Sequence, residues 1–143
     1  MSDNLIKKIF LSNLLIILFN GCSYFNTFYN ANQYYEEANK IRLEKDGQAV
    51  PITAMDKYGK AIEKCKKVLR EFPESKLRSD AILLMAKAQF FRSDYDLALD
   101  NLKEISNEGS KNQREESNYW RALCCILNTS PSPRDATLSR MTS

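Results

Sequence analysis

Apolar residues recur with helical spacing through much of the chain, and one four-residue pattern occurs twice, 37 residues apart. Each copy reads aromatic, two residues, alanine, three residues, bulky apolar, two residues, bulky apolar. The copies are Tyr58, Ala61, Cys65 and Val68, and then Tyr95, Ala98, Leu102 and Ile105. This spacing places all four side chains on one face of an α-helix. The small alanine allows a neighbouring helix to approach closely, so the pattern predicts two helices that pack through these residues.

A third predicted helix lies between the two copies, at residues 81–91 (AILLMAKAQFF). Its apolar stripe consists of Ile82, Met85, Ala86 and Phe90. Ser75 or Ser79 is the expected N-cap, and a turn at residues 92–94 leads into the second copy. Pro73 is expected to end the helix of the first copy, because proline cannot continue a helix.

One further helix is expected on each side of this region. Residues 32–45 (NQYYEEANKIRLEK) form a helix that a loop at residues 46–52 joins to the first copy. Residues 113–127 form another, because Tyr119-Trp120-Arg121-Ala122 lies 36 residues after Leu83-Leu84-Met85-Ala86. No partner helix is expected after it. The pattern therefore predicts an all-α protein with two complete helical pairs and half of a third.

These pairs resemble the tetratricopeptide repeat (TPR), a unit of about 34 residues in which two helices form a hairpin. Residues that match its consensus include Pro73, Ala86, Tyr95 and Ala98, whereas Ile82, Gln89 and Ser93 replace its Trp, Tyr and Gly. The resemblance implies that residues 32–127 form TPR hairpins stacked as an α-solenoid, which binds extended or helical peptides on its concave side. It implies repeat-packing roles for Tyr58, Ala61, Cys65, Val68, Ala86, Tyr95, Ala98 and Leu102.

Residues 1–21 resemble the signal peptide of a bacterial lipoprotein. Two lysines precede an apolar stretch of 11 residues (IFLSNLLIILF), which is too short to span a bilayer, and Gly21-Cys22 follows. Phe19 and Asn20 depart from the lipobox pattern. The resemblance implies a covalent lipid on Cys22; an uncleaved anchor and soluble export are the alternatives. Ser23 replaces the Asp that retains lipoproteins in the inner membrane, which favours the periplasmic face of the outer membrane over an inner-membrane anchor.

Composition argues against catalysis and against nucleic-acid binding. The 143 residues include no histidine, the commonest general base and metal ligand. The net charge of +3 is too small to support nucleic-acid binding by itself. The four cysteines lack the paired spacing of a zinc or redox site, and Cys65 and one of Cys124 and Cys125 are expected in the core. We therefore expect no enzyme activity, no metal and no cofactor beyond the lipid on Cys22.

Two segments flank the predicted repeats. Residues 22–31 (CSYFNTFYNA) are rich in aromatic side chains, which fits a membrane-proximal platform or, the favoured interpretation, the start of a helix that packs on the repeats. Residues 128–143 are polar, contain two prolines and show no helical stripe. They resemble tails containing SPSPRDATLSRM that recur on unrelated sequences, which suggests a non-native tail. A native disordered terminus is the alternative.

A basic stripe runs beside the apolar face of the first copy. It consists of Lys57, Lys60, Lys64 and Lys67. These lysines are candidates for binding acidic lipid headgroups or an acidic protein partner. Because several glutamates lie nearby in the sequence, a solvated helix face is the favoured interpretation.

Together with the signal, two short stretches resemble the BamD family, the TPR lipoproteins of the outer-membrane β-barrel assembly machinery. They are Phe72-Pro73-Glu74-Ser75-Lys76 and Tyr95-Asp96-Leu97-Ala98, and residues 22–31 resemble the mature starts of bacterial TPR lipoproteins. The resemblance implies a scaffold that binds envelope proteins or peptides, above all the barrel-forming subunit and unfolded barrel precursors. A TPR lipoprotein of cell-envelope or cell-division coordination is the alternative. A cell-wall enzyme is less favoured, because the sequence presents no paired carboxylates or activated nucleophile.

Overall fold

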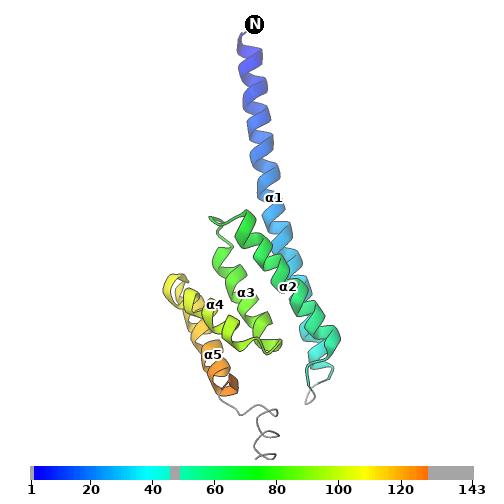
Figure 1. Cartoon of the computed structure of the whole chain (residues 1–143). Coiled ribbons are helices and arrows are strands. Elements are labelled where there is room, and N and C mark those ends of the chain that lie inside the picture. Colours follow the sequence, from blue (N-terminus) through cyan, green and yellow to red (C-terminus); the bar gives the residue numbers. More distant parts are fainter. Residues whose placement is uncertain (1, 46–48, 129–143) are drawn as a thin grey trace, which may run out of the picture.

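The structure is a computed structural model that describes residues 2–45 and 49–128, without the side chains of residues 2–6 and 10–24. Its helices are α1 (Ser2–Leu43), α2 (Ile52–Glu71), α3 (Arg78–Phe91), α4 (Tyr95–Glu108) and α5 (Lys111–Asn128). The described residues contain no strand, which confirms the prediction of an all-α protein (Figure 1). The helix predicted at residues 32–45 is the C-terminal part of α1, and the other predicted helices correspond to α2, α3, α4 and α5.

The first helix continues through a region in which the sequence indicated separate segments. α1 runs without a break past Cys22 to Leu43. Thr27, Ala31, Tyr35 and Ala38 recur every four or three residues along it and are buried. The face that packs on the rest of the protein therefore begins within the aromatic segment at residues 22–31. Among the helices of the described residues, none has the length and apolar character needed to cross a membrane.

The central helix of the structure is α3. Each helix packs against its neighbours in the sequence, and α3 also contacts α1 and α5. Residues 81–86 are consequently all buried, whereas the sequence predicted a stripe on one face. Phe90, a member of that predicted stripe, is only partly buried. The sequence therefore underestimated how much of α3 is covered, because helices pack on two of its sides.

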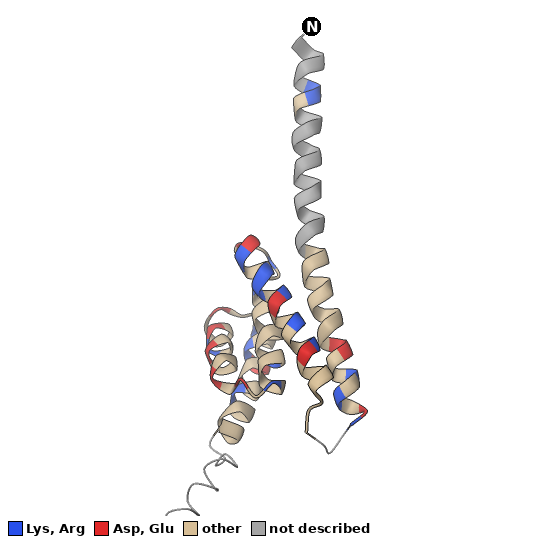
Figure 2. Ribbon diagram, turned by 45° about the vertical axis from the view of Figure 1, so that its right-hand side comes forward, with Lys and Arg blue, Asp and Glu red and all other residues tan. Residues whose placement is uncertain are grey.

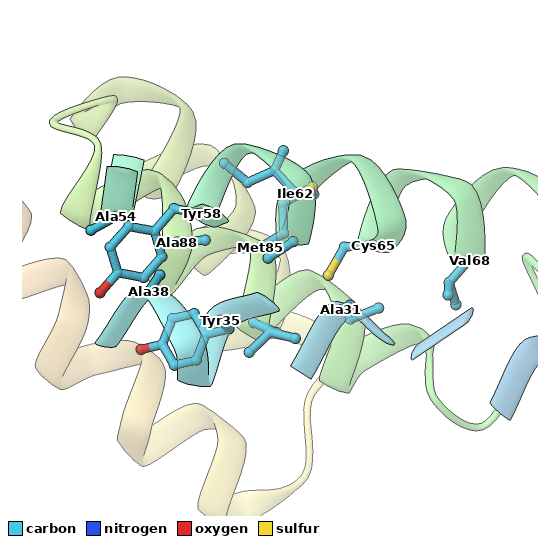
Figure 3. Close-up of a cluster of buried hydrophobic side chains, with 13 residues drawn as sticks. Ala31, Tyr35, Ala38, Ala54, Tyr58, Ile62, Cys65, Val68, Met85 and Ala88 are labelled. Carbon is cyan, nitrogen blue, oxygen red and sulfur yellow. The ribbon is translucent and has the colours of Figure 1, made fainter. Parts of the chain in front are cut away.

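Two groups of buried side chains lie on opposite sides of α3. The first core cluster joins α1, α2 and α3, and the second joins α3, α4 and α5. In the first cluster, Tyr35 of α1 and Tyr58 of α2 lie close together with Met85 and Ala88 of α3 nearby (Figure 3). The ring centres of the two tyrosines are 5.6 Å apart.

The helix ends confirm one prediction and contradict another. α2 ends at Glu71, two residues before Pro73, as expected. α3 begins at Arg78 with Leu77 as its N-cap, and no side chain caps it, so the expected cap at Ser75 or Ser79 is wrong. Backbone bonds supply the turn instead: the Arg78 N–H donates to the Ser75 carbonyl at 3.0 Å.

The start of α5 has a side-chain cap that the sequence analysis missed. α5 begins at Lys111, two residues before the predicted start. The Ser110 N–H donates to Gln113 Oε1 at 2.8 Å, and the Gln113 N–H donates to Ser110 Oγ at 3.4 Å. This reciprocal pair is a capping box, whose Ser-x-x-Gln signature is readable in the sequence.

Candidate functional site

The residues predicted to pack the repeats lie in the two core clusters. Tyr58, Ala61, Cys65 and Val68 are buried in the first cluster, and Ala86, Ala98 and Leu102 are buried in the second. Tyr95 differs, because it is only partly buried and packs against the edge of the second cluster. These side chains pack the interior of the helical array.

The cysteines are separated by their environments. Cys65 is buried in the first core cluster, and this burial raises the pKa of its thiol from 9.0 to about 12. Cys124 is buried and Cys125 is exposed, so one member of the vicinal pair is in the core, as expected. The side chain of Cys22, the predicted lipidation site, lies outside the described residues.

The four candidate lysines lie along α2, beside α1. The Lys57 ammonium donates to Glu37 Oε2, and this hydrogen bond is the main cause of the raised pKa of Lys57. The Lys60 ammonium lies 5.8 Å from the centre of the Tyr34 ring, and Lys67 forms an ion pair with Glu71 at 3.8 Å. Lys64 is half-buried on the same row. The row is therefore partly neutralised at its two ends.

A second surface, formed by α1, α3 and α5, was not predicted in this detail. We name it the α1–α3–α5 face. At its centre the Lys87 ammonium donates to Glu116 Oε1 at 2.9 Å and lies 5.5 Å from the Tyr35 ring centre and 5.9 Å from that of Trp120. Trp120 Nε1 also donates to Glu116 Oε1, at 3.3 Å. One lysine of α3 therefore contacts both neighbouring helices.

Aromatic side chains connect the same three helices. The Phe91 ring of α3 lies 6.5 Å from Tyr35 and 5.7 Å from Trp120, measured between ring centres. The Arg42 guanidinium of α1 lies 4.3 Å from the centre of the Phe91 ring, and its Nε donates to the Tyr58 hydroxyl at 3.3 Å. A cation over the face of an aromatic ring is attracted to that face. The contact of Arg42 with Phe91 therefore joins α1 to α3.

Between α1 and α3 this face is hollowed into a groove of about 210 Å³. Its lining combines apolar and polar side chains: Phe28, Asn32, Asp80, Leu83, Leu84 and Lys87. Gln113 Nε2 of α5 donates to Asp80 Oδ1 at 2.6 Å, which fixes the acidic side of the groove. A shallow, mixed groove of this kind can accept a side chain of a bound peptide, and polar groups at its margin can orient the peptide.

Sequence reasoning missed this surface because its residues carry no motif. Asp80, Lys87 and Phe91 are spaced by seven and four residues, which places them on one face of α3. That spacing is a readable signal. Their partners Gln113, Glu116 and Trp120 come from a helix that only the tertiary structure brings alongside.

Comparisons with protein-family models, with curated proteins and with solved structures gave no match for this chain. In the part of the chain that the structure describes, no group of three or more His, Cys, Asp or Glu side chains is arranged to hold a metal ion.

Proposed function

We propose that this protein is a lipid-anchored periplasmic scaffold of the TPR type, which binds protein partners in outer-membrane β-barrel assembly. The observation that carries the binding function is the groove between α1 and α3, with Lys87 and its aromatic neighbours at its margin. Side-chain pairs between helices fix the geometry of this face, so a partner meets a surface that is already organised.

The TPR part of the proposal is supported by the order of helix contacts. α1 and α2 form one pair, α3 and α4 form the next, and α5 packs on α4. The first helices of the two pairs, α1 and α3, contact each other, and α3 also contacts α5. Stacked TPR hairpins place their first helices in this way and bind peptides along them.

The assignment to barrel assembly is supported by the resemblance of residues 72–76 and 95–98, together with the signal, to the BamD family. Residues 22–31 resemble the mature starts of bacterial TPR lipoproteins more generally. The partner proposed from the BamD resemblance is the barrel-forming subunit, with the outer membrane as the location. An inner-membrane anchor in the periplasm is the alternative location. The lipid on Cys22 holds the scaffold at the membrane, because several acyl chains bind a bilayer stably.

A binding measurement with the purified barrel-forming subunit tests the proposed function. Asn32 lines the groove and is half-buried, so Asn32→Arg fills the groove with little effect on the core. We expect this variant to bind at least about tenfold more weakly, a loss of about 1.4 kcal/mol. Asn107→Arg is the matched control, because Asn107 is exposed on α4. Equal binding by both variants would contradict the role of the groove, and no binding by the unchanged protein would contradict the partner.

The anchor is tested separately by mass spectrometry of protein extracted from membranes. We expect an acylated N-terminal Cys22 in the unchanged protein. The Cys22→Ala variant should lose both processing after Gly21 and stable membrane attachment. A Cys22→Ala protein that is still cut at Gly21 and still membrane-bound would exclude lipidation at this residue.

A further inference from the structure

α2 carries an excess of positive charge along its length. It contains six Lys or Arg residues and three Asp or Glu residues. Figure 2 shows the basic residues spread along this helix beside α1. At its C-terminal end, Lys64, Lys67 and Arg70 follow one another at intervals of three residues, which keeps them on neighbouring parts of one face.

These C-terminal cations are available for an external partner. Glu71 is shared between Lys67 at 3.8 Å and Arg70 at 3.4 Å. The Arg70 side chain is 73% exposed. Surface ion pairs of this kind contribute little to stability and exchange readily, and one carboxylate cannot neutralise two cations. The end of α2 therefore retains positive charge.

The pairing of α1 with α2 places this end close to the proposed lipid anchor. The two helices are antiparallel, since Glu37 pairs with Lys57 and Ala31 lies near Cys65 and Val68 (Figure 3). Each step toward the C-terminal end of α2 is therefore a step toward the start of α1. Among the described residues, Val68 is the last buried residue of α2 and Thr27 is the first buried residue of α1. At a rise of 1.5 Å per residue, Thr27 is about 8 Å along α1 from Cys22.

The same turns of α1 expose aromatic side chains. Phe25 is 57% exposed and Tyr29 is 60% exposed, one helical turn apart. Aromatic side chains are enriched at the boundary between membrane and water, where Lys and Arg contact headgroups. The anchor end of the molecule thus combines the two kinds of side chain that interact with a lipid surface.

We propose that the anchor end of α1 and α2 docks on anionic phospholipid headgroups of the bilayer, through Lys64, Lys67 and Arg70 with Phe25 and Tyr29. This inference rests on the proposed lipid anchor, which brings these residues to the membrane surface. Basic residues next to an anchor gain from the negative surface potential of such a membrane. Docking fixes the direction in which the helical array extends from the membrane, and so the position of the groove.

The test uses lipidated full-length protein on two kinds of vesicle. One set contains phosphatidylethanolamine with roughly one quarter phosphatidylglycerol, and the other replaces the anionic lipid by phosphatidylcholine. An amine-reactive label is applied, and its rate at each lysine is read by mass spectrometry. We expect Lys64 and Lys67 to react about fivefold more slowly on the anionic vesicles, with the protection lost in about 0.5 M NaCl. Lys103 and Lys111 are exposed on α4 and at the start of α5 and should react equally on both.

A matched pair of triple variants sharpens the result. Lys60 is exposed on α2, about one turn before Lys64, and we expect docking to protect it on anionic vesicles as well. In Lys64→Gln/Lys67→Gln/Arg70→Gln, Lys60 should lose this protection. In Lys103→Gln/Lys111→Gln/Arg114→Gln, which removes the same charge, Lys60 should stay protected.

The outcomes separate the docking from the anchor. Protein that floats with both vesicles but is labelled equally at Lys64 and Lys67 would overturn the docking and leave the anchor intact. Protein that floats with neither would overturn both. Protection of these lysines in intact cells but not on vesicles would show that an acidic protein, and not lipid, covers this surface, which overturns the proposal.

Discussion

The α2 and α4 helices carry the same apolar pattern but bury its aromatic residue to different extents. Tyr58 is fully buried and is the seventh residue of the 20-residue α2, whereas Tyr95 is the first residue of the 14-residue α4 and is half-buried. The alanines that follow, Ala61 and Ala98, are both fully buried. The equal spacing therefore fixes which residues share a helix face. How deeply the aromatic residue of the pattern is buried depends on its position relative to the start of the helix.

The neighbours of the two tyrosines explain the difference. The Tyr58 hydroxyl donates to Asn39 Oδ1 at 2.7 Å and accepts from Arg42, and the Tyr58 ring stacks on Phe91 at 5.2 Å. The Tyr95 hydroxyl contacts Ser93 Oγ at 3.4 Å in the turn before its own helix. The C-terminal end of α1 covers Tyr58. Within the described residues no helix covers the hydroxyl of Tyr95 in the same way.

Removing the aromatic side chains of Tyr58 and Tyr95 should give the largest difference in stability between the two positions. Tyr58→Ala leaves a cavity in the first core cluster and should lower the free energy of unfolding by roughly 3 to 5 kcal/mol. Tyr95→Ala removes a half-buried ring and should cost roughly 1 to 2 kcal/mol. Urea unfolding followed by circular dichroism measures both. Equal losses would contradict the structural difference between the two positions.

Enlarging Ala61 of α2 and Ala98 of α4 should destabilise the protein to a similar extent, because both side chains are fully buried. Ala61→Leu and Ala98→Leu each force a larger side chain into a site with no exposed surface, and each should cost about 1 to 3 kcal/mol. Ala122→Leu serves as the control, because Ala122 is exposed on α5. Unchanged melting of both buried variants would contradict the packing of α2 and α4.

Removing only the hydroxyl groups tests the polar contacts. Tyr58→Phe leaves Asn39 without its donor and should cost about 1 to 2 kcal/mol. Tyr95→Phe should cost less than about 0.5 kcal/mol, because its contact is long and exposed. The same urea experiment reads both values, and a larger loss for Tyr95→Phe would reverse the interpretation.

A pH series adds a second measurement to the hydroxyl variants. Burial raises the pKa of Tyr58 from 10.0 to about 12. As the pH rises, the unfolded chain therefore releases this proton before the folded protein does. The contribution of Tyr58 to the free energy of unfolding is complete below pH 10.0 and falls as the pH rises to about 12. Tyr35, whose pKa burial also raises from 10.0 to about 12, contributes over the same range. Cys65, whose pKa burial raises from 9.0 to about 12, contributes a fall that begins at pH 9.0. Tyr58→Phe should make the fall shallower.

The smallest expected effect concerns the way the chain enters α4. Ser93 has φ 64, in the left-handed region that glycine adopts more easily, whereas Pro51 before α2 has φ −61 in an extended conformation. Ser93→Gly should therefore stabilise the protein by about 0.5 to 1 kcal/mol. Ser79→Gly, inside α3, should destabilise it by about 0.5 kcal/mol. A loss of stability in Ser93→Gly would argue that the serine hydroxyl matters more than the backbone conformation.

By itself, the sequence determined where α2, α3, α4 and α5 lie and most of the residues that pack α2 and α4, but it gave only the C-terminal part of α1. Periodic apolar positions are local information, because a helix repeats every 3.6 residues whatever surrounds it, and so the faces of α2 and α4 and the burial of Cys65 were predictable. The start of α3 was predicted wrongly, because a backbone turn and not a serine side chain precedes it. The capping box of α5 was readable but was missed.

Only the tertiary structure decided which surfaces meet. The burial of α3 on two sides depends on helices that are far apart in the sequence, and no periodicity within α3 reveals them. The same is true of Lys87 between Tyr35 and Trp120, and of Lys57 beside Glu37 of α1. Such neighbours are set by the register between helices, which is fixed when all the core side chains pack at once.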